Sequence, residues 1–303
     1  MPQARVGDLS LEYRSDGPPD APPLLLIMGT AAPLTMWDDA FCAALSARGF
    51  RVIRFDYRDT GRSSRVDAPM PSTIGAMMRA FAEGKLAPPY ALEDLADDTV
   101  GLLDALGVER AHLVGLSQGA GVAQLVAARA SERVTGLTLI ATSTAARDVP
   151  PPAAETMGVL LSDLPNDRAS FIEWNVLMYT KTGGIHPPPD VDWIRRRAER
   201  TWDHGWDVAG FLRHLLAVIS ATDRRPLLAR LRLPVTIVQG EADPIFSVAA
   251  AEQVVAAIPG ARLCVVPGMG HDVAPPFWNA IFAAIGPVTD RASSWPGTPP
   301  SCW

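Results

Sequence analysis

The sequence predicts an α/β fold in which a mostly parallel sheet carries helices on both faces and a helical cap is inserted into the chain. Short, wholly apolar runs recur along it, as expected of strands that are buried on both faces. Segments with a helical period of apolar residues separate these runs. The alternation lapses over residues 143–225 and then resumes, which places the cap there.

Composition and charge indicate a globular chain without polyanionic partners. Hydrophobic residues make up 48% and charged residues 20% of the 303 residues, so a sizeable core can be buried. The formal net charge is −6, which leaves no basic field to attract nucleic acid or an anionic membrane. The one cationic run, Arg195 to Arg197, lies in a helix-like stretch and is interpreted as a solvated face.

The cysteines and the N-terminal segment predict a reducing, cytoplasmic setting. Three cysteines without C-x-x-C spacing argue against a disulfide framework and a structural zinc site. The N-terminal segment has no apolar signal region, and the longest apolar runs fall far short of the ~20 residues of a membrane span. The histidines are scattered and no phosphate-binding glycine loop is present, so we expect no metal or organic cofactor.

The first part of the core, residues 1–142, begins with a β-hairpin, predicted over 5–14 from alternating residues around a Gly-Asp pair. Gly49 and Gly107 are expected to end the first two helices. The expected strands are 24–29, 51–56, 111–117 and 134–142, and the expected helices are 37–48, 92–106 and 118–130.

The cap and the second part of the core follow. Two Pro-Pro-Pro runs, a Gly-Gly pair and helix-like pieces rich in tryptophan and arginine characterise the cap over 143–225. The turn-rich segment 287–303 is predicted to be a poorly ordered tail. The second part of the core, 226–286, is expected to contain strands 235–240 and 261–268 and helices 247–257 and 275–285.

Ser117 lies in a G-x-S-x-G pattern between a predicted strand and a predicted helix. A sharp strand-to-helix turn needs small residues on both sides of the nucleophile, because larger side chains would collide with the flanking elements. The pattern alone arises easily by chance, but its position at the end of an apolar run makes it informative. We therefore interpret Ser117 as a nucleophile.

A serine hydroxyl needs a base within hydrogen-bond reach, and His271 is the best candidate among five histidines. It follows the strand 261–268 in a Gly-Met-Gly-His-Asp turn, at the edge where parallel sheets place their chemistry. His112 opens the strand that carries Ser117 and is interpreted as structural. The remaining histidines lie in the cap and are interpreted as surface, core or pocket-lining residues: His186, His204 and His214.

The third member of a triad must be a carboxylate on the same edge. Asp243 follows the strand 235–240, with Glu241 as a neighbouring alternative. No carboxylate ends the strand 134–142, which removes the other common location for the acid. The resulting order Ser, Asp, His is the one expected of this sheet-and-helix architecture.

The oxyanion formed during attack needs preorganised N–H donors, each lowering the barrier by ~3–4 kcal/mol. One donor is expected to be the backbone amide of Gln118, directly after the nucleophile. The other is expected in the turn at Gly29 and Thr30, most directly from the Thr30 amide.

Five segments carry a resemblance to a known family: LLLIMGT (24–30), RVIRFDYRDTGRSS (51–64), AHLVGLSQGA (111–120), QGEADPIF (239–246) and PGMGHD (267–272). Over residues 5–286 the chain resembles an α/β-hydrolase. Within that superfamily it is similar to the aclacinomycin methylesterase type of anthracycline-pathway esterase and its bacterial relatives. The resemblance implies a mobile helical cap over a largely apolar pocket, and the triad and oxyanion roles given above for Ser117, Asp243, His271, Thr30 and Gln118.

The chain departs from those esterases at two positions. Thr30 stands where glycine is usual, and Gln118 stands where methionine is common. Both changes keep the backbone donors, so they bear on the substrate rather than on hydrolysis. The charged turn from Asp56 to Ser63 is typical of the superfamily, and we interpret it as structural, with its Asp and Arg side chains bonded beneath the oxyanion loop.

Aromatic residues are concentrated in the cap between residues 171 and 214. They are expected to pack the cap onto the core, and some of them to form an aromatic wall for a flat or hydrophobic acyl group. The candidate substrate contacts are Gly29, Trp174, Met178, Trp202 and Trp206.

Together these residues predict a serine hydrolase, a monomer or a homodimer, acting on a hydrophobic small-molecule ester. A methyl ester of an aromatic polyketide is one candidate substrate, from the resemblance. Hydrolysis of a lactone, a thioester or a carbon–carbon bond, or a perhydrolase activity, would use the same triad. A small-molecule binding protein without turnover is the alternative from another class. Epoxide hydrolases and haloalkane dehalogenases need an aspartate at position 117 and are set aside.

Overall fold

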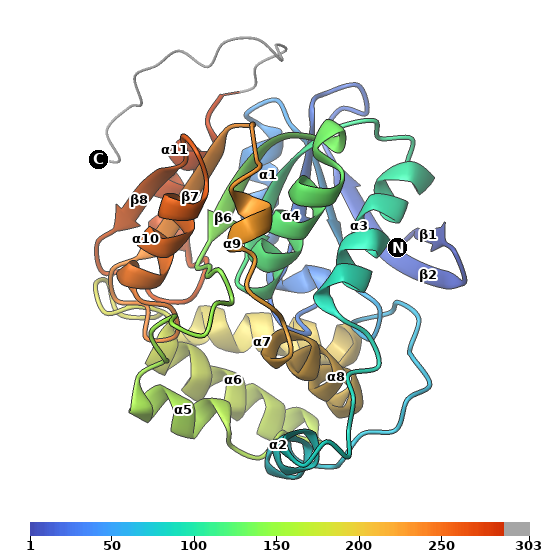
Figure 1. Cartoon of the computed structure of the whole chain (residues 1–303), viewed down its shortest axis with the longest axis vertical. Helices are drawn as coiled ribbons and strands as arrows, with labels where there is room; N and C mark the ends of the chain where they lie inside the picture. The colour runs from blue at the N-terminus through green and yellow to red at the C-terminus, as the bar shows by residue number, and fades with distance from the viewer. Residues whose placement is uncertain (288–303) are drawn as a thin grey trace.

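One eight-stranded sheet forms the centre of the computed structural model, which describes residues 1–287 (Figure 1). Its strands are Gln3–Val6 (β1), Leu9–Asp16 (β2), Pro23–Ile27 (β3), Arg51–Phe55 (β4), Ala111–Leu116 (β5), Val134–Ile140 (β6), Val235–Gly240 (β7) and Arg262–Val266 (β8). The spatial order is β1-β2-β4-β3-β5-β6-β7-β8. Strands β3 to β8 are parallel, while the N-terminal hairpin is antiparallel and joins through β4. The predicted fold class is confirmed.

Helices of the core cover both faces of this sheet, and other helices form the cap. They are Asp39–Ser46 (α1), Ile74–Ala82 (α2), Leu92–Ala105 (α3), Gln118–Arg129 (α4), Ala154–Leu160 (α5), Arg168–Thr182 (α6), Val191–Gly205 (α7), Val208–Ile219 (α8), Arg225–Leu228 (α9), Val248–Ala257 (α10) and Trp278–Ile285 (α11). Apolar residues of α3, α4, α9 and α10 share one buried cluster with the sheet. Those of α1 and α11 share the cluster on the other face. The strands are apolar throughout because both faces are covered.

The cap helices α5 to α8 lie between β6 and β7 in the chain and gather at one end of the sheet, together with α2 (Figure 1). Helix α2 is an element that the sequence analysis did not assign. Its Ile74 and Met77 pack against Leu212 and Leu216 of α8 in a small buried cluster. Residues 74–82, expected within the first part of the core, therefore lie against the inserted helices.

Two further expectations concern the ends of the chain and membranes. The tail expected over 287–303 falls, apart from its first residue, outside the described residues. Among residues 1–287, no helix combines the length and the apolar character needed to cross a bilayer.

Candidate active site

Ser117 occupies a strained turn between β5 and α4. Its backbone has φ 56° and ψ −117°, a left-handed region that non-glycine residues rarely adopt. The Ser117 amide donates a 2.9 Å hydrogen bond to the Ile140 carbonyl, which ties this turn to the end of β6. Strained residues of this kind persist where the surrounding structure holds them, and they cluster at functional sites.

The glycines of the G-x-S-x-G pattern are required by close backbone approach. A Cβ at Gly115 would lie 2.4 Å from the Gly119 carbonyl oxygen, and a Cβ at Gly119 would lie 2.1 Å from the Ile27 carbonyl oxygen. Such distances are far inside van der Waals contact. The steric reason predicted for the small residues around Ser117 is therefore present in the structure.

Asp243 and His271 are brought together from the loops after β7 and β8. The Nδ1 atom of His271 lies 2.8 Å from Oδ2 of Asp243. Because a carboxylate only accepts hydrogen bonds, Nδ1 carries the proton and Nε2 keeps the lone pair that a base needs. Glu241, the alternative acid, is exposed, and its Oε2 accepts instead from the Gly268 amide at 3.3 Å.

The surroundings of Asp243 hold its carboxylate in one orientation. Its Oδ1 accepts from the amides of Ile245 and Phe246 at 2.8 and 3.0 Å, and Oδ2 also accepts from Nε2 of Gln239 at 3.2 Å. Burial alone lowers the pKa of His271, but the charge of Asp243, its hydrogen bond and the charge of Asp272 together raise that pKa above its ordinary value. The pair is thus arranged to stabilise an imidazolium.

Ser117 lies on the same edge but is not bonded to the His271–Asp243 pair within residues 1–287. Ser117, Asp243 and His271 follow the carboxyl ends of β5, β7 and β8, which belong to one parallel run of strands. In the part of the chain that the structure describes, no hydrogen bond joins the Ser117 hydroxyl to His271. Such contacts are often long until substrate binds. The Ser117–His271 contact accordingly stays a prediction.

The predicted oxyanion donors flank Ser117. A Cβ at Gly29 would lie 3.6 Å from Cβ of Ser117, so the turn after β3 runs directly beside the nucleophile. Gln118 is the first residue of α4. The amide N–H groups of a first helical turn have no partner within the helix, and they stabilise a nearby negative charge. Within residues 1–287, the amides of Thr30 and Gln118 donate no hydrogen bond to another protein group. Both are therefore free to bind an oxyanion.

The charged turn after β4 supports the loop that contains Thr30. Asp56 accepts hydrogen bonds from the amides of Leu34 at 2.7 Å and Arg62 at 3.0 Å. The Tyr57 hydroxyl donates to the Met28 carbonyl at 3.2 Å. The contacts of Asp56 and Tyr57 with the neighbouring loop agree with the structural interpretation of this turn. The Arg58 guanidinium, also expected beneath that loop, pairs with Asp98 of α3 instead.

One group of possible metal ligands occurs among the described residues: Glu12, Asp56 and His204, whose ligand atoms lie within 4.8 Å of one another. Asp56 already accepts from two backbone amides, and Nε2 of His204 lies at a hydrogen-bond distance of 2.7 Å from it. We interpret the group as a buried polar link between α7 of the cap and the core.

Two further histidines are hydrogen-bonded, His112 partly buried and His214 fully buried. His112 bonds Thr138 through Nε2 at 2.9 Å, and burial lowers its pKa to about 4, in line with the structural role expected for it. His214, on α8, bonds the Arg58 carbonyl through Nε2 at 2.8 Å and the side chain of Gln118 through Nδ1 at 2.8 Å. This contact of a cap histidine with the residue after Ser117 has no local sequence signal that predicts it.

Three of the four cap tryptophans pack around Phe171. The ring centroids of Trp174, Trp202 and Trp206 lie 6.4, 5.5 and 4.8 Å from that of Phe171. The indole N–H groups of Trp174 and Trp206 donate to the Ser162 hydroxyl and to a backbone carbonyl. These contacts hold the cap helices to one another, whereas the aromatic residues were expected to pack the cap onto the core. The substrate role of Trp174, Met178, Trp202 and Trp206 stays a prediction.

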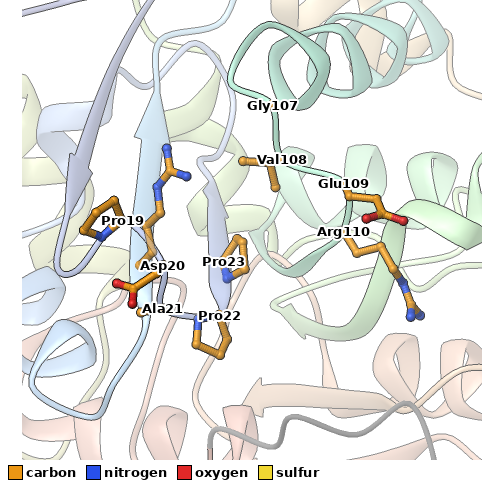
Figure 2. A pocket seen from close by; sticks show the side chains of 10 residues that line it. Pro19, Asp20, Ala21, Pro22, Pro23, Gly107, Val108, Glu109 and Arg110 are labelled. Carbon is orange, nitrogen blue, oxygen red and sulfur yellow. The ribbon is translucent and has the colours of Figure 1, made fainter.

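A surface hollow of about 380 Å³ lies away from the triad (Figure 2). It is lined by Pro19 to Pro23, Arg51 and the loop 107–110, and so sits at the amino ends of β3, β4 and β5. Ser117 follows the opposite end of β5. The hollow is therefore separated from the proposed nucleophile by the length of a strand.

The comparisons with known proteins identify the family of the chain. A family model described as alpha/beta hydrolase fold matches residues 22–275. The chain belongs to this family. Rhodomycin D methylesterase DauP of Streptomyces sp. (strain C5) is 31% identical, covering 94% of the chain and 97% of that protein. Rhodomycin D methylesterase DnrP of Streptomyces peucetius is 30% identical, covering 97% and 100%.

A solved structure of a hydrolase from Pseudomonas aeruginosa PA01 is 30% identical to the chain. The match covers 93% of the present chain and 97% of the Pseudomonas hydrolase, with a TM-score of 0.68. Together with the methylesterase relatives, it supports hydrolase activity on esters.

Proposed function

We propose that this α/β-hydrolase is a serine hydrolase that cleaves a carboxylic ester through an acyl-enzyme intermediate. Ser117 is the nucleophile, His271 the base and Asp243 the residue that orients the base. The observation that carries the proposal is the 2.8 Å hydrogen bond between His271 and Asp243, on the sheet edge where Ser117 occupies its strained turn.

The reaction follows from these groups. Oγ of Ser117 attacks the ester carbonyl carbon while its proton passes to Nε2 of His271. The carbonyl oxygen becomes an oxyanion, which accepts hydrogen bonds from the amides of Thr30 and Gln118. Collapse expels the alcohol, which takes the proton from His271. A water then attacks the acyl-enzyme with His271 as base, and the carboxylic acid leaves as Ser117 regains its proton.

The proposed substrate is a neutral, hydrophobic ester, with a methyl ester of an aromatic polyketide as the first candidate. This choice is motivated by two relatives that are rhodomycin D methylesterases and align over nearly the whole chain. A lactone is the second candidate, because 3-oxoadipate enol-lactonase 2 of Acinetobacter baylyi (strain ATCC 33305 / BD413 / ADP1) is 25% identical over 80% of the chain.

Covalent labelling with a fluorophosphonate probe tests the nucleophile directly. We expect labelling of the wild type, loss of labelling in Ser117→Ala, and unchanged labelling in Ser220→Ala, whose hydroxyl bonds the Ala217 carbonyl in the cap. Failure to label folded wild-type protein would remove the proposal. A panel of methyl esters, p-nitrophenyl esters and lactones then ranks the substrates, and tight binding without product would favour a binding protein.

A further inference from the structure

A buried ion pair joins the cap to the residue that follows the proposed base. Arg197, on α7, makes two hydrogen bonds of 2.8 Å to the two carboxylate oxygens of Asp272. The side chains are only 2% and 5% exposed. The run Arg195 to Arg197 was expected to be a solvated face, and this is wrong for Arg197. Arg196 is exposed, whereas Arg197 lies on the buried side of the helix.

The surroundings of Arg197 fix its guanidinium in one place. The group lies 4.2 Å from the ring centroid of Tyr179 and 4.2 Å from that of Trp193. Planar stacking together with two-pronged pairing to a carboxylate is a geometry that arginine provides and lysine does not. A buried charge needs such compensation, because an unpaired ion in the interior is strongly destabilising.

Backbone contacts clamp the same loop from the cap side. The His271 amide donates to the Thr182 carbonyl at 2.6 Å, and the Ile185 amide donates to the Gly268 carbonyl at 2.9 Å. Between them, Gly184 and Met269 form an isolated antiparallel bridge. The loop that carries His271 is therefore held in place by the last residue of α6 and the segment that follows it.

The Arg197–Asp272 ion pair also affects the pKa of His271, because Asp272 lies beside the imidazole. Asp243 and Asp272 both act on the imidazole and raise its pKa. Arg197 balances the charge of Asp272, and Tyr179 and Asp38 are the other titratable groups that act on Arg197. Without the arginine, Asp272 would be a buried and unbalanced carboxylate next to the base. The imidazolium would then be stabilised further, and less of the histidine would be a free base near neutral pH.

We propose that Arg197 is a positioning residue for His271: through Asp272 it holds the histidine loop and balances the negative charge beside the base. The inference rests on the proposed function, in which His271 is the base. In this arrangement helices α6 and α7 of the cap help to hold the loop that carries His271. Substrate entry then needs movement elsewhere in the cap, since lifting this part would separate a buried ion pair and open the histidine loop.

The test is the pH profile of kcat/KM for a p-nitrophenyl ester. The acidic limb reports the deprotonation of the base in the free enzyme. In Arg197→Gln we expect this limb to move to higher pH by about one unit, because a positive charge that disfavours the imidazolium is lost. In Asp272→Asn we expect it to move to lower pH. In the double variant we expect it to return close to the wild-type position, because both charges are gone.

A matched control uses a second buried ion pair between cap and core. Arg213, on α8, pairs with both carboxylate oxygens of Asp59 at 2.8 and 2.9 Å, in the turn after β4. Arg213→Gln should lower stability, as Arg197→Gln does, but leave the acidic limb in place. If Arg197→Gln and Asp272→Asn also leave the limb in place and change only KM or stability, the pair is merely structural and the proposal is overturned.

Two further measurements keep the inference testable. If Arg197→Gln does not fold, Arg197→Lys should retain the wild-type limb while Asp272→Asn shifts it, and an unshifted Asp272→Asn overturns the proposal. An NMR titration of the His271 imidazole measures the same shift without turnover. Wild type that neither hydrolyses esters nor labels at Ser117 would remove the proposed function, whereas the titration would still decide the role of Arg197.

Discussion

Nδ1 of His214 accepts a 2.8 Å hydrogen bond from the side-chain amide of Gln118, so that a cap helix contacts the residue directly after the proposed nucleophile. The direction of this bond follows from the other ring nitrogen. Nε2 faces the Arg58 carbonyl, which only accepts, so Nε2 carries the proton and Nδ1 accepts. Oε1 of Gln118 is buried without a partner within the described residues. The glutamine is therefore held by its nitrogen alone.

Replacing His214 tests how much this bridge stabilises the fold. His214→Leu leaves the Gln118 amide and the Arg58 carbonyl buried without partners, each at a cost of about 1–3 kcal/mol. We expect the free energy of unfolding to fall by about 2–6 kcal/mol in urea denaturation. His186→Leu, at an exposed position, is the control and should change it by less than about 0.5 kcal/mol. An equal effect of the two substitutions would contradict the bridge.

The free energy of unfolding should fall between pH 6.5 and pH 4 because two histidines have a lowered pKa. Burial lowers the pKa of His112 and of His214 to about 4, below the ordinary value of 6.5. The unfolded chain therefore binds more protons than the folded chain in this window, and stability is complete above pH 6.5 and lost as the pH falls toward 4. Each histidine contributes at most about 3 kcal/mol.

Urea denaturation across pH 4–7 measures this effect, and His112→Gln should make the slope shallower. His271 acts in the opposite direction. Its folded pKa is raised, so the stability it contributes is present below its unfolded pKa and lost as the pH rises through the folded one. A His112→Gln variant as steep as the wild type would show that His112 titrates normally.

The turn at Ser117 predicts a sharp contrast between two glycine substitutions. Gly119→Ala forces a Cβ to within 2.1 Å of the Ile27 carbonyl, a rigid backbone atom, so we expect more than about 3 kcal/mol of destabilisation or no soluble protein. Gly158→Ala, in α5, meets nothing within 4 Å and should stabilise by about 0.5–1 kcal/mol. Thermal melts compare the two. Tolerance of Gly119→Ala would contradict the close approach of α4 and β3.

Sequence reasoning located Ser117, Asp243 and His271 because each one follows an apolar strand in a turn, which is a local signal. The contacts that it missed join residues far apart in the chain. Arg197 lies 75 positions from Asp272, and Gln118 lies 96 positions from His214. No local period encodes a partner at such a separation.

A signal for the orientation of Arg197 was nevertheless present. Ile194, Arg197, Ala198, Thr201 and His204 are buried and follow one face of α7 at helical spacing. Of the three consecutive arginines, only Arg197 shares the buried face with Ile194 and Ala198. The packing of α2 on α8 was missed for a different reason, since a short helix after a long loop has no local pattern that names its partner.

The hydrogen bond that orients His271 predicts a large loss of kcat when Asp243 is changed. Asp243→Asn keeps the shape of the side chain, but its amide group can donate to Nδ1 of His271 and so favours the proton on Nε2, where the base must accept one. We expect kcat on a p-nitrophenyl ester to fall by about 10⁴-fold, as found when the acid of a serine triad is changed in this way. Glu241→Gln is the control. Its carboxylate is exposed and bonds the Gly268 amide, so kcat should stay within about threefold of wild type, a free-energy change of less than about 0.7 kcal/mol. The reverse order of effects would move the acid to Glu241 and require His271 to turn away from Asp243.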